Sequence, residues 1–330
     1  MPLLQITATR SGLTSAAAPV GCRGAPASDS PEALLRHALR DLPDDAPILV
    51  MIHGMGYVPG RAAVDPHRLI FAPRSGLATR RYLSWPRHLR FTPAVPHEPT
   101  ARPGLCIGFG WDGSGGVWAA SRRAEAAAQP LARLVQMIAR AAPGRPVDLF
   151  AHSLGARVAL GAVPLLHARA LGRVFLLAGA ELGPRARRVL HTPAAYGAEF
   201  FNITTRENDL FDVLFEISQI PLHGRGPSIG LGLGAAPNWL DLQIDHPPVL
   251  ESLAGLGFDL APPGLRVCHW SVYLRPGIFR LYRALVHDRA RLTLPLLQQT
   301  LLLPPTPRWS RLLPGERGLP FSRGGPSLPR

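Results

Sequence analysis

Ser153 stands in the segment of the sequence that is best suited to nucleophilic chemistry. An apolar run over residues 147–151 ends just before it, and an alanine-rich helical pattern starts just after it. A serine on such a strand–turn–helix presents its hydroxyl at the edge of a sheet, where a base can take its proton. Ala151 and Gly155 lie two residues away on either side, and their small size lets strand and helix approach closely. The simpler interpretation is an ordinary turn whose serine caps the helix.

The block Ala151-His152-Ser153-Leu154-Gly155 resembles the nucleophile elbow of the α/β-hydrolase superfamily. That elbow has the pattern G-x-S-x-G, and the present chain has alanine in place of the first glycine. The resemblance implies that Ser153 is the nucleophile. It also implies that the backbone amide of Leu154 is one donor of the oxyanion hole.

A second block, His53-Gly54-Met55-Gly56, directly follows the apolar run 47–52. It resembles the loop that supplies the second oxyanion donor in the same superfamily. The expected donor is the amide of Met55, with the amide of Gly56 as the alternative. The side chain of His53 is expected to hold this loop through hydrogen bonds rather than to act as the catalytic base.

The acid of a triad is expected between the serine and the histidine, because the superfamily has the order Ser, Asp or Glu, His. The strand-like run 199–204 is followed by Thr205-Arg206-Glu207-Asn208-Asp209-Leu210-Phe211-Asp212. Asp209 is the preferred acid because it lies on the loop at the carboxyl edge of the sheet. Asp212, in the helix that follows, is the second choice, and Glu207 is the third. Acids that stabilise a helix N-terminus offer a purely structural explanation.

The base is expected among the histidines that follow these acids, which are His223, His246, His269 and His287. His269 is preferred because it precedes a helix that begins near Pro276, and the superfamily places its base on a loop ahead of the last helices. A packed pair with the neighbouring Trp270 is the alternative interpretation.

Several blocks are also similar to those of a narrower group, a bacterial α/β-hydrolase family of unassigned substrate. Its members share an H-G-Y-N loop, an F-S-W-P-S block, an A-H-S-M-G elbow and an S-R-N-D segment followed by L-H-G and P-R-L-G. The corresponding segments here are 53–56, 109–113, 151–155, 205–209, 222–224 and 226–230, within roughly residues 47–285. The resemblance implies that Asp209 and His269 complete the triad. The chain departs from the family at 55–56 and 112–113, which lie at the expected pocket rim.

Short apolar runs alternate with helical patterns through the body of the chain. Strands are expected at 3–9, 47–52, 105–109, 147–151, 173–178 and 199–204. Helices are expected at about 31–42, 121–141, 156–170 and 184–190, and after residue 209. Continuous apolar strands separated by helices are typical of a parallel sheet covered on both faces. The predicted class is α/β, with a mostly parallel central sheet and helices on both faces, as in the α/β-hydrolase fold.

The composition excludes several classes of function. The 330 residues carry a net charge of +14, and all 36 basic residues are arginines dispersed along the chain. Such dispersion argues against sequence-specific nucleic-acid binding, although it favours weak attraction to anions and acidic membrane surfaces. The three cysteines form no C-x-x-C pair, and the glycines at 230–234 lack the spacing of a dinucleotide loop. We therefore expect neither a metal nor a cofactor.

The predicted organisation is an N-terminal strand and loop (1–30), a hydrolase domain (31–302) and a disordered Pro/Arg-rich tail (303–330). No apolar run approaches the ~20 residues of a transmembrane helix, and no signal peptide is evident, so a cytoplasmic location is expected. The predicted function is a serine hydrolase acting on an acyl compound, most simply a carboxylic ester. The alternatives are a catalytically weak small-molecule or partner-binding protein, and a binder of anionic surfaces that uses the basic tail.

Overall fold

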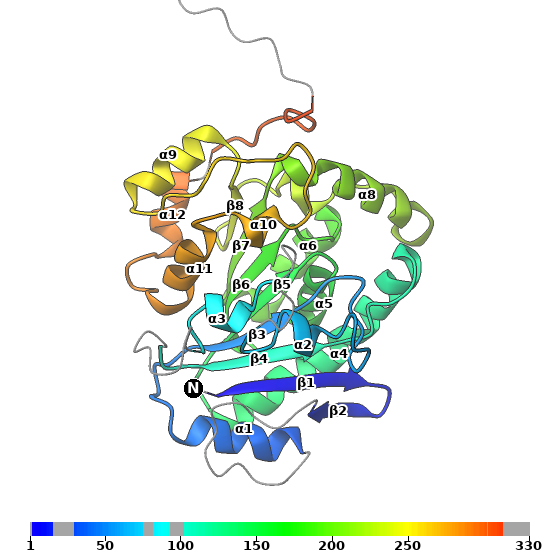
Figure 1. The fold of residues 1–330 in the computed structure, drawn as a ribbon, viewed down its shortest axis with the longest axis vertical. Coiled ribbons are helices and arrows are strands. Elements are labelled where there is room, and N and C mark those ends of the chain that lie inside the picture. The colour runs from blue at the N-terminus through cyan, green and yellow to red at the C-terminus, as the bar shows by residue number, and fades with distance from the viewer. Residues whose placement is uncertain (1, 16–29, 75–81, 93–101, 302, 313–330) are drawn as a thin grey trace, which may run out of the picture.

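The computed structural model describes residues 2–15, 30–74, 82–92, 102–301 and 303–312, which form one eight-stranded sheet with helices on both faces (Figure 1). Most of the predicted N-terminal loop, including Cys22, lies outside the described residues. So do positions 313–330 of the predicted tail.

The sheet is parallel except at one edge. In spatial order its strands are β2 (Gly12–Ser15), β1 (Leu3–Thr9), β4 (Leu105–Gly110), β3 (Ile48–Ile52), β5 (Val147–His152), β6 (Leu171–Leu177), β7 (Glu199–Thr204) and β8 (Trp239–Gln243). The pair β1–β2 is antiparallel, and every other neighbouring pair is parallel.

The central strands are almost entirely apolar because both of their faces are buried. Every residue of β3, β4 and β5 is buried. In the sheet Ile52, the last residue of β3, is level with Phe109 on β4 and Ala151 on β5. The loops that follow β3 and β5 therefore leave the same edge of the sheet side by side. This is the carboxyl edge, where ligands bind in open parallel sheets.

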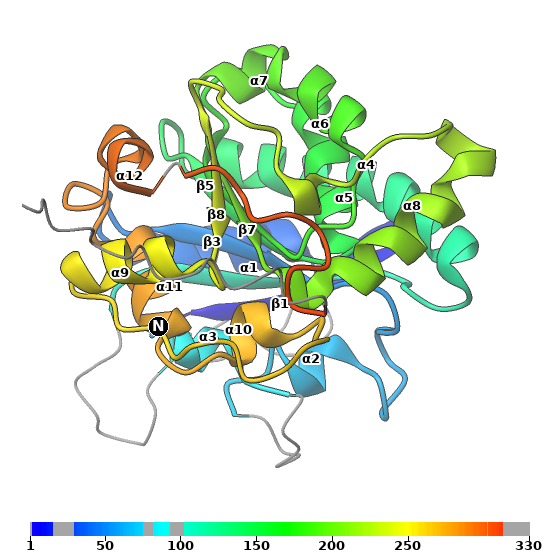
Figure 2. The same ribbon diagram turned by 90° about the horizontal axis from the view of Figure 1, so that it is seen from above.

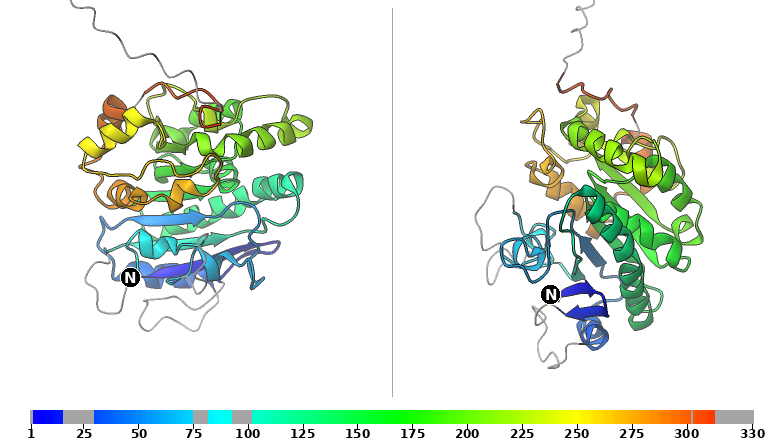
Figure 3. Two further views of the ribbon diagram at one scale, coloured as in Figure 1. Left: turned by 45° about the horizontal axis from the view of Figure 1, so that its top comes forward. Right: turned by 90° about the vertical axis from the view of Figure 1, so that its right-hand side faces the viewer.

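Helices form a layer on each face of the sheet. They are α1 (Pro31–Arg40), α2 (Pro66–Leu69), α3 (Trp85–His88), α4 (Val117–Ala141), α5 (Gly155–Ala162), α6 (Gly183–Leu190), α7 (Pro193–Tyr196), α8 (Asp209–His223), α9 (Pro247–Gly255), α10 (Ser271–Leu274), α11 (Ile278–His287) and α12 (Leu294–Leu301). Single 3-10 turns are η1 (Val163–Leu165), η2 (Arg206–Asn208) and η3 (Ile229–Leu231). Figure 2 shows α4, α5, α6 and α7 on one face, and α3, α10 and α11 on the other. The two views of Figure 3 show the same three layers, a sheet between two layers of helices, with α8 at the periphery.

Each face buries its own core. One core joins Leu34 of α1, Leu131 of α4 and Val158 of α5 to the sheet. The other joins Trp85 of α3 and Tyr282 of α11 to the opposite side. Two separate cores explain why strands with apolar side chains on both faces are stable at the centre of the molecule.

The predicted α/β class and its mostly parallel sheet are confirmed. The expected strands are present, and β2 and β8 are two further strands that the sequence patterns did not indicate. Among the described residues, no helix is both long and apolar enough to span a bilayer.

Candidate active site

Ser153 occupies a tight turn between β5 and α5. Its φ of 55° places it in the left-handed region, which costs a non-glycine residue of order 1 kcal/mol. Two hydrogen bonds fix this conformation: Ser153 N donates to Leu177 O (3.0 Å), and Ala180 N donates to Ser153 O (3.0 Å). The turn therefore rests on the end of β6 and holds the serine side chain at the carboxyl edge.

Glycine is required at Gly155, just after this turn, and at Gly54, on the loop after β3, because the two segments approach closely. A Cβ at Gly155 would lie 2.6 Å from the carbonyl oxygen of His53. A Cβ at Gly54 would lie 2.7 Å from the Cβ of Ser153. The loop after β3 is thus pressed against the serine turn, and Ala151 is accommodated within the fully buried end of β5.

His269 reaches Ser153 from the loop that precedes α10. Its Nε2 lies 2.8 Å from Ser153 Oγ, so the sequence correctly predicted that this serine and this histidine lie together. Its Nδ1 lies 2.6 Å from Asn208 Oδ1. An imidazole that donates from Nδ1–H to the amide oxygen accepts the serine proton at Nε2, which is the tautomer a general base needs.

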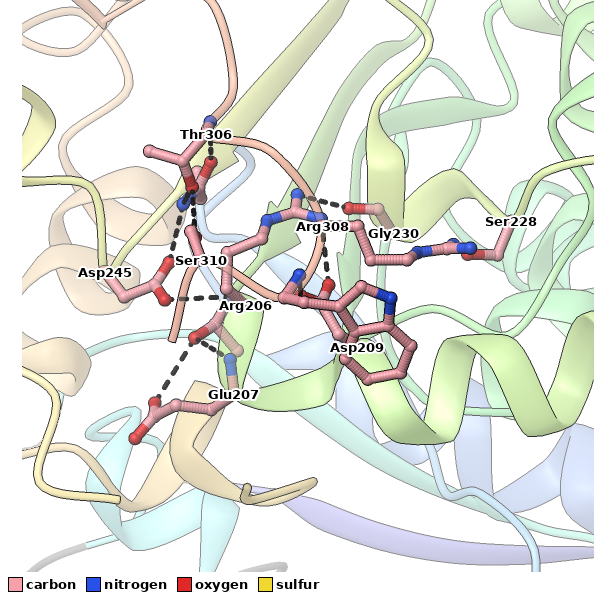
Figure 4. Close-up of polar contacts among 12 residues, drawn as sticks. Arg206, Glu207, Asp209, Ser228, Gly230, Asp245, Thr306, Arg308 and Ser310 are labelled. Atoms are coloured by element: carbon pink, nitrogen blue, oxygen red, sulfur yellow. Dashed lines mark hydrogen bonds and ion pairs between the residues drawn. The ribbon is translucent and has the colours of Figure 1, made fainter. Parts of the chain in front are cut away.

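Asp209, the preferred acid, does not face His269. Its carboxylate accepts hydrogen bonds from Arg206 Nη1 (3.0 Å) and from the backbone amide of Trp309 (2.7 Å). Figure 4 shows Asp209 directed toward Arg206. Asn208 ends the turn η2 and Asp209 begins α8, and successive helical side chains point about 100° apart. Only one of the two can face the histidine, and the structure places Asn208 there.

The two alternative acids have other partners. Asp212, one turn after Asn208, is buried and forms a side-chain hydrogen bond with it. Burial raises the pKa of Asp212 to about 7, against the opposing effect of Arg206. An Asp212 carboxylate that accepts from the Asn208 amide nitrogen orients the amide oxygen toward His269.

Glu207 acts as a brace for the histidine loop. Its carboxylate pairs with Arg275 and accepts a hydrogen bond from Leu265 N (3.2 Å), while its carbonyl oxygen accepts from Cys268 N (2.8 Å). These contacts fasten the residues immediately before His269 to the loop after β7. None of the three acids therefore contacts the imidazole.

His152 packs beside the base. Its ring centroid lies 4.7 Å from that of His269, and its Nε2–H donates to the His269 carbonyl oxygen at 3.2 Å. Burial lowers the pKa of His152 to about 4, so the ring is neutral at pH 7. Burial, and then the neighbouring His152, likewise hold the pKa of His269 well below its usual value.

The loop after β3 carries Met55, one expected oxyanion donor, and the other, Leu154, directly follows Ser153. Met55 and Leu154 both line the cavity beside the serine. Within the described residues neither of their amides donates to another backbone or side chain, whereas Gly56 N donates to Gly113 O at 2.8 Å. Gly56 is therefore engaged, which favours Met55 as the donor from this loop.

The structural role expected for His53 is confirmed by its hydrogen bonds. Its Nδ1–H donates to Gly54 O (2.8 Å), and its Nε2 accepts from Trp111 N (3.0 Å). Burial lowers the pKa of His53 to about 3, so it remains neutral while it holds the loop.

Ser153 and His269 open into an apolar cavity of about 560 Å³. Its walls come from the loop after β3, from the start of α4, from α8 and from the residue after the base. They include Met55, Tyr57, Val117, Phe211, Leu214, Phe215 and Trp270. A cavity of this size and lining suits a hydrocarbon chain or ring next to a reactive carbonyl.

The expectation of a disordered tail does not hold for residues 303–312. Arg308 forms two hydrogen bonds with Glu216 of α8 (2.6 and 2.9 Å), and Thr306 exchanges hydrogen bonds with Gln243 of β8 (2.9 and 2.7 Å). Figure 4 shows this segment, which we call the strap, lying across the loop after β7. With the bond from Trp309 to Asp209, the strap fastens the element that carries Asn208.

No family model matches the sequence, and a search of curated proteins gives no match either. Among the described residues, no three His, Cys, Asp or Glu side chains group as metal ligands would. The fold and the site therefore define the class of protein by themselves. It is an α/β protein with a Ser–His–Asn arrangement at the carboxyl edge of a mostly parallel sheet.

Ending the chain after Pro304 should destabilise the protein and lower its activity. The strap contributes several buried or half-buried hydrogen bonds at about 1 kcal/mol each, so we expect a loss of about 2–3 kcal/mol. Chemical denaturation and turnover of an activated ester measure the two effects. Ending the chain after Leu312 is the matched control, because it keeps the strap. Equal stability of the two truncations would contradict a fastening role for the strap.

Asp212→Asn should remove a pH dependence of stability. The folded protein holds a proton on Asp212 up to about pH 7, whereas an unfolded aspartate releases it near pH ~3.9. Since the folded state binds more protons in this window, wild-type stability should fall relative to the variant as pH rises through it, and stay level above it. Urea titrations across the window measure this difference. Asp44→Asn, which removes an exposed carboxylate, is the control, and parallel curves for wild type and Asp212→Asn would refute a raised pKa.

Proposed function

We propose that the protein is a serine hydrolase of the α/β-hydrolase type that cleaves carboxylic esters through an acyl-enzyme. The observation that carries this proposal is the 2.8 Å contact between Ser153 Oγ and His269 Nε2, beside an apolar cavity. The left-handed serine turn at the carboxyl edge of the sheet supports it, since such an elbow exposes a nucleophile.

In the first half of the reaction Ser153 Oγ attacks the ester carbonyl carbon while His269 Nε2 takes the hydroxyl proton. The carbonyl oxygen becomes an oxyanion, and we expect the amides of Met55 and Leu154, two residues that line the cavity, to stabilise it. The tetrahedral intermediate then expels the alcohol, which receives the proton from His269. The product of this half is an acyl group on Ser153.

In the second half His269 takes a proton from water, and the resulting hydroxide attacks the acyl carbonyl. Collapse of this intermediate releases the carboxylic acid, and the proton on His269 returns to Ser153. The histidine thus acts as base and acid in each half.

Asn208 takes the place that an acid has in a Ser–His–Asp triad. Its amide oxygen fixes the imidazole tautomer, as an aspartate does, but it carries no charge to stabilise the imidazolium. A Cys–His–Asn arrangement is known to support acyl transfer, so the amide is compatible with this chemistry. The low pKa of His269 accords with a neutral partner.

Labelling with a fluorophosphonate tests the nucleophile. We expect one adduct on Ser153, because only a base-activated serine in an oxyanion hole reacts readily. Intact-protein mass and peptide mapping measure it, and Ser153→Ala should abolish it while the protein remains folded. If folded wild-type protein stays unlabelled after prolonged exposure, the alternative of a binding protein without turnover becomes the better interpretation.

The pH profile tests the partner of the histidine. Since the base must be neutral, kcat/KM of the wild type should reach half its maximum below pH ~6.5, the ordinary histidine pKa. Asn208→Asp puts a carboxylate against Nδ1, which stabilises the imidazolium and should move this limb upward by about one pH unit or more. Turnover of an activated ester, assayed from about pH 4 to about pH 8, measures the acidic limb of the profile for the wild type and for Asn208→Asp.

Asp209→Asn is the matched control for this shift. Asp209 contacts Arg206 and the strap and does not contact His269. The acidic limb of the kcat/KM profile of Asp209→Asn should therefore lie at the same pH as that of the wild type. A limb that moves in Asp209→Asn and not in Asn208→Asp would restore Asp209 as the triad acid.

A further inference from the structure

One surface of α8 is apolar and open to solvent. Leu210, Leu214, Ile217 and Ile220 follow one another at three- and four-residue spacing, so they form a single stripe. Leu214 and Ile217 are 56% and 59% exposed. The opposite side of the helix, with Phe215 and Gln219, is buried against the body. An amphipathic helix normally turns such a stripe toward a core, and this one turns it outward.

The stripe continues on neighbouring elements around the cavity mouth. Trp118, at the start of α4, is 53% exposed, and its indole N–H donates to Ser218 O of α8 at 2.6 Å. Leu265 and Val267 are exposed on the loop that leads to His269, and Met55 is exposed on the loop after β3. We call this set the apolar collar: Met55, Trp118, Leu210, Leu214, Ile217, Ile220, Leu265 and Val267.

The apolar collar is concentrated rather than scattered. It holds eight of the eleven large apolar side chains that are exposed in the described part of the chain, and Leu165, Tyr196 and Leu296 are the other three. Two of its members, Met55 and Leu214, also line the cavity. Exposed apolar side chains gathered on the elements around a cavity mark a place where another apolar phase or molecule binds.

Arginines accompany the collar. Arg266 is exposed between Leu265 and Val267, Arg122 lies one helical turn after Trp118, and Arg225 follows the end of α8. Arg311 of the strap donates to Leu265 O. The acids at the same rim are already paired: Asp112 with Arg123, and Glu216 with Arg308. The collar is therefore apolar at its centre and positively charged around it.

We propose that the apolar collar docks the protein on an anionic lipid surface. An apolar stripe bordered by arginines is the pattern of a helix that lies in a membrane interface. In a symmetric pair of chains the same arginines would face one another, so charge disfavours a second copy as the occupant. The open mouth of the cavity then faces the lipid, and an acyl ester can pass from the surface to Ser153. This last step rests on the proposed hydrolase function, whereas docking does not.

Binding to vesicles tests the docking. The probe is Ser153→Ala protein, which cannot consume lipid, mixed with phosphatidylcholine vesicles with and without phosphatidylglycerol and separated by sedimentation. We expect binding that requires phosphatidylglycerol and weakens at high salt. Ile217→Ser in the same background should lower the bound fraction at limiting lipid by about tenfold. The reason is that it removes a large apolar side chain that docking would bury in the lipid.

Tyr196→Ser, in the same Ser153→Ala background, is the matched control. Tyr196 is 70% exposed on α7, outside the collar, so this variant should bind vesicles as the Ser153→Ala protein does. In an otherwise wild-type chain, Ile217→Ser should keep its turnover of a soluble short-chain ester, since Ile217 does not line the cavity. Failure to bind either kind of vesicle, or equal loss in both variants, overturns the proposal. A mass that doubles with concentration and reverts to the monomer in Ile217→Ser assigns the collar to a second copy. Vesicle binding without fluorophosphonate labelling rejects the hydrolase and leaves the docking in place.

Discussion

The close approach of two backbones at the carboxyl edge of the sheet is the constraint on which the site depends. The loop after β3 presses on the turn of Ser153, and this contact is possible only because Gly54 and Gly155 have no side chains. The serine is held in a left-handed conformation by bonds to residues at the end of β6. Strain of this kind persists only where several surrounding contacts fix the conformation. Here those contacts come from β5 itself and from the segments that follow β3 and β6.

Charge around the loop after β7 explains why an amide stands next to the histidine. Asp209 and Asp212 already share the vicinity of Arg206, and all three side chains are buried. A further carboxylate at position 208 would add a negative charge to a region where burial already raises the pKa of both aspartates. Asparagine gives the same hydrogen-bond acceptor to His269 without that electrostatic cost.

The sequence predicts the parts of the fold that depend on apolar patterning. Buried strands such as β3 and β4 are continuous apolar runs, and the serine turn is indicated by small residues at fixed spacing. β8 is not predicted because only three of its five residues are apolar, with Asp241 at its centre and Gln243 at its end. That carboxylate accepts hydrogen bonds from the amides of Leu233 and Gly234, a role that no periodicity reveals.

The partner of His269 was assigned one residue too late for a similar reason. Chain order indicates the segment that carries it, but the direction of each side chain depends on where α8 begins. Asp209, the first residue of α8, also accepts a hydrogen bond from the distant strap, which no local pattern reveals. The strap itself is held by polar side chains and has no periodic apolar face, so composition alone made it look like a free tail.

The strap has a consequence for the order in which the molecule is assembled. Trp309 and Asp209 are 100 residues apart in the sequence, and all eight strands are synthesised before the strap is. Forming a contact of such long range has a large entropic cost of loop closure. Hydrogen bonds can offset this cost only when the surface that the strap binds has already formed. The sheet and its two cores can therefore form first, and the hydrogen bonds between the strap and the segment that carries Asn208 form afterwards. In the folded protein the same segment should be among the first to detach in local opening, so the order of the loop after β7 varies with the strap while the serine turn stays fixed.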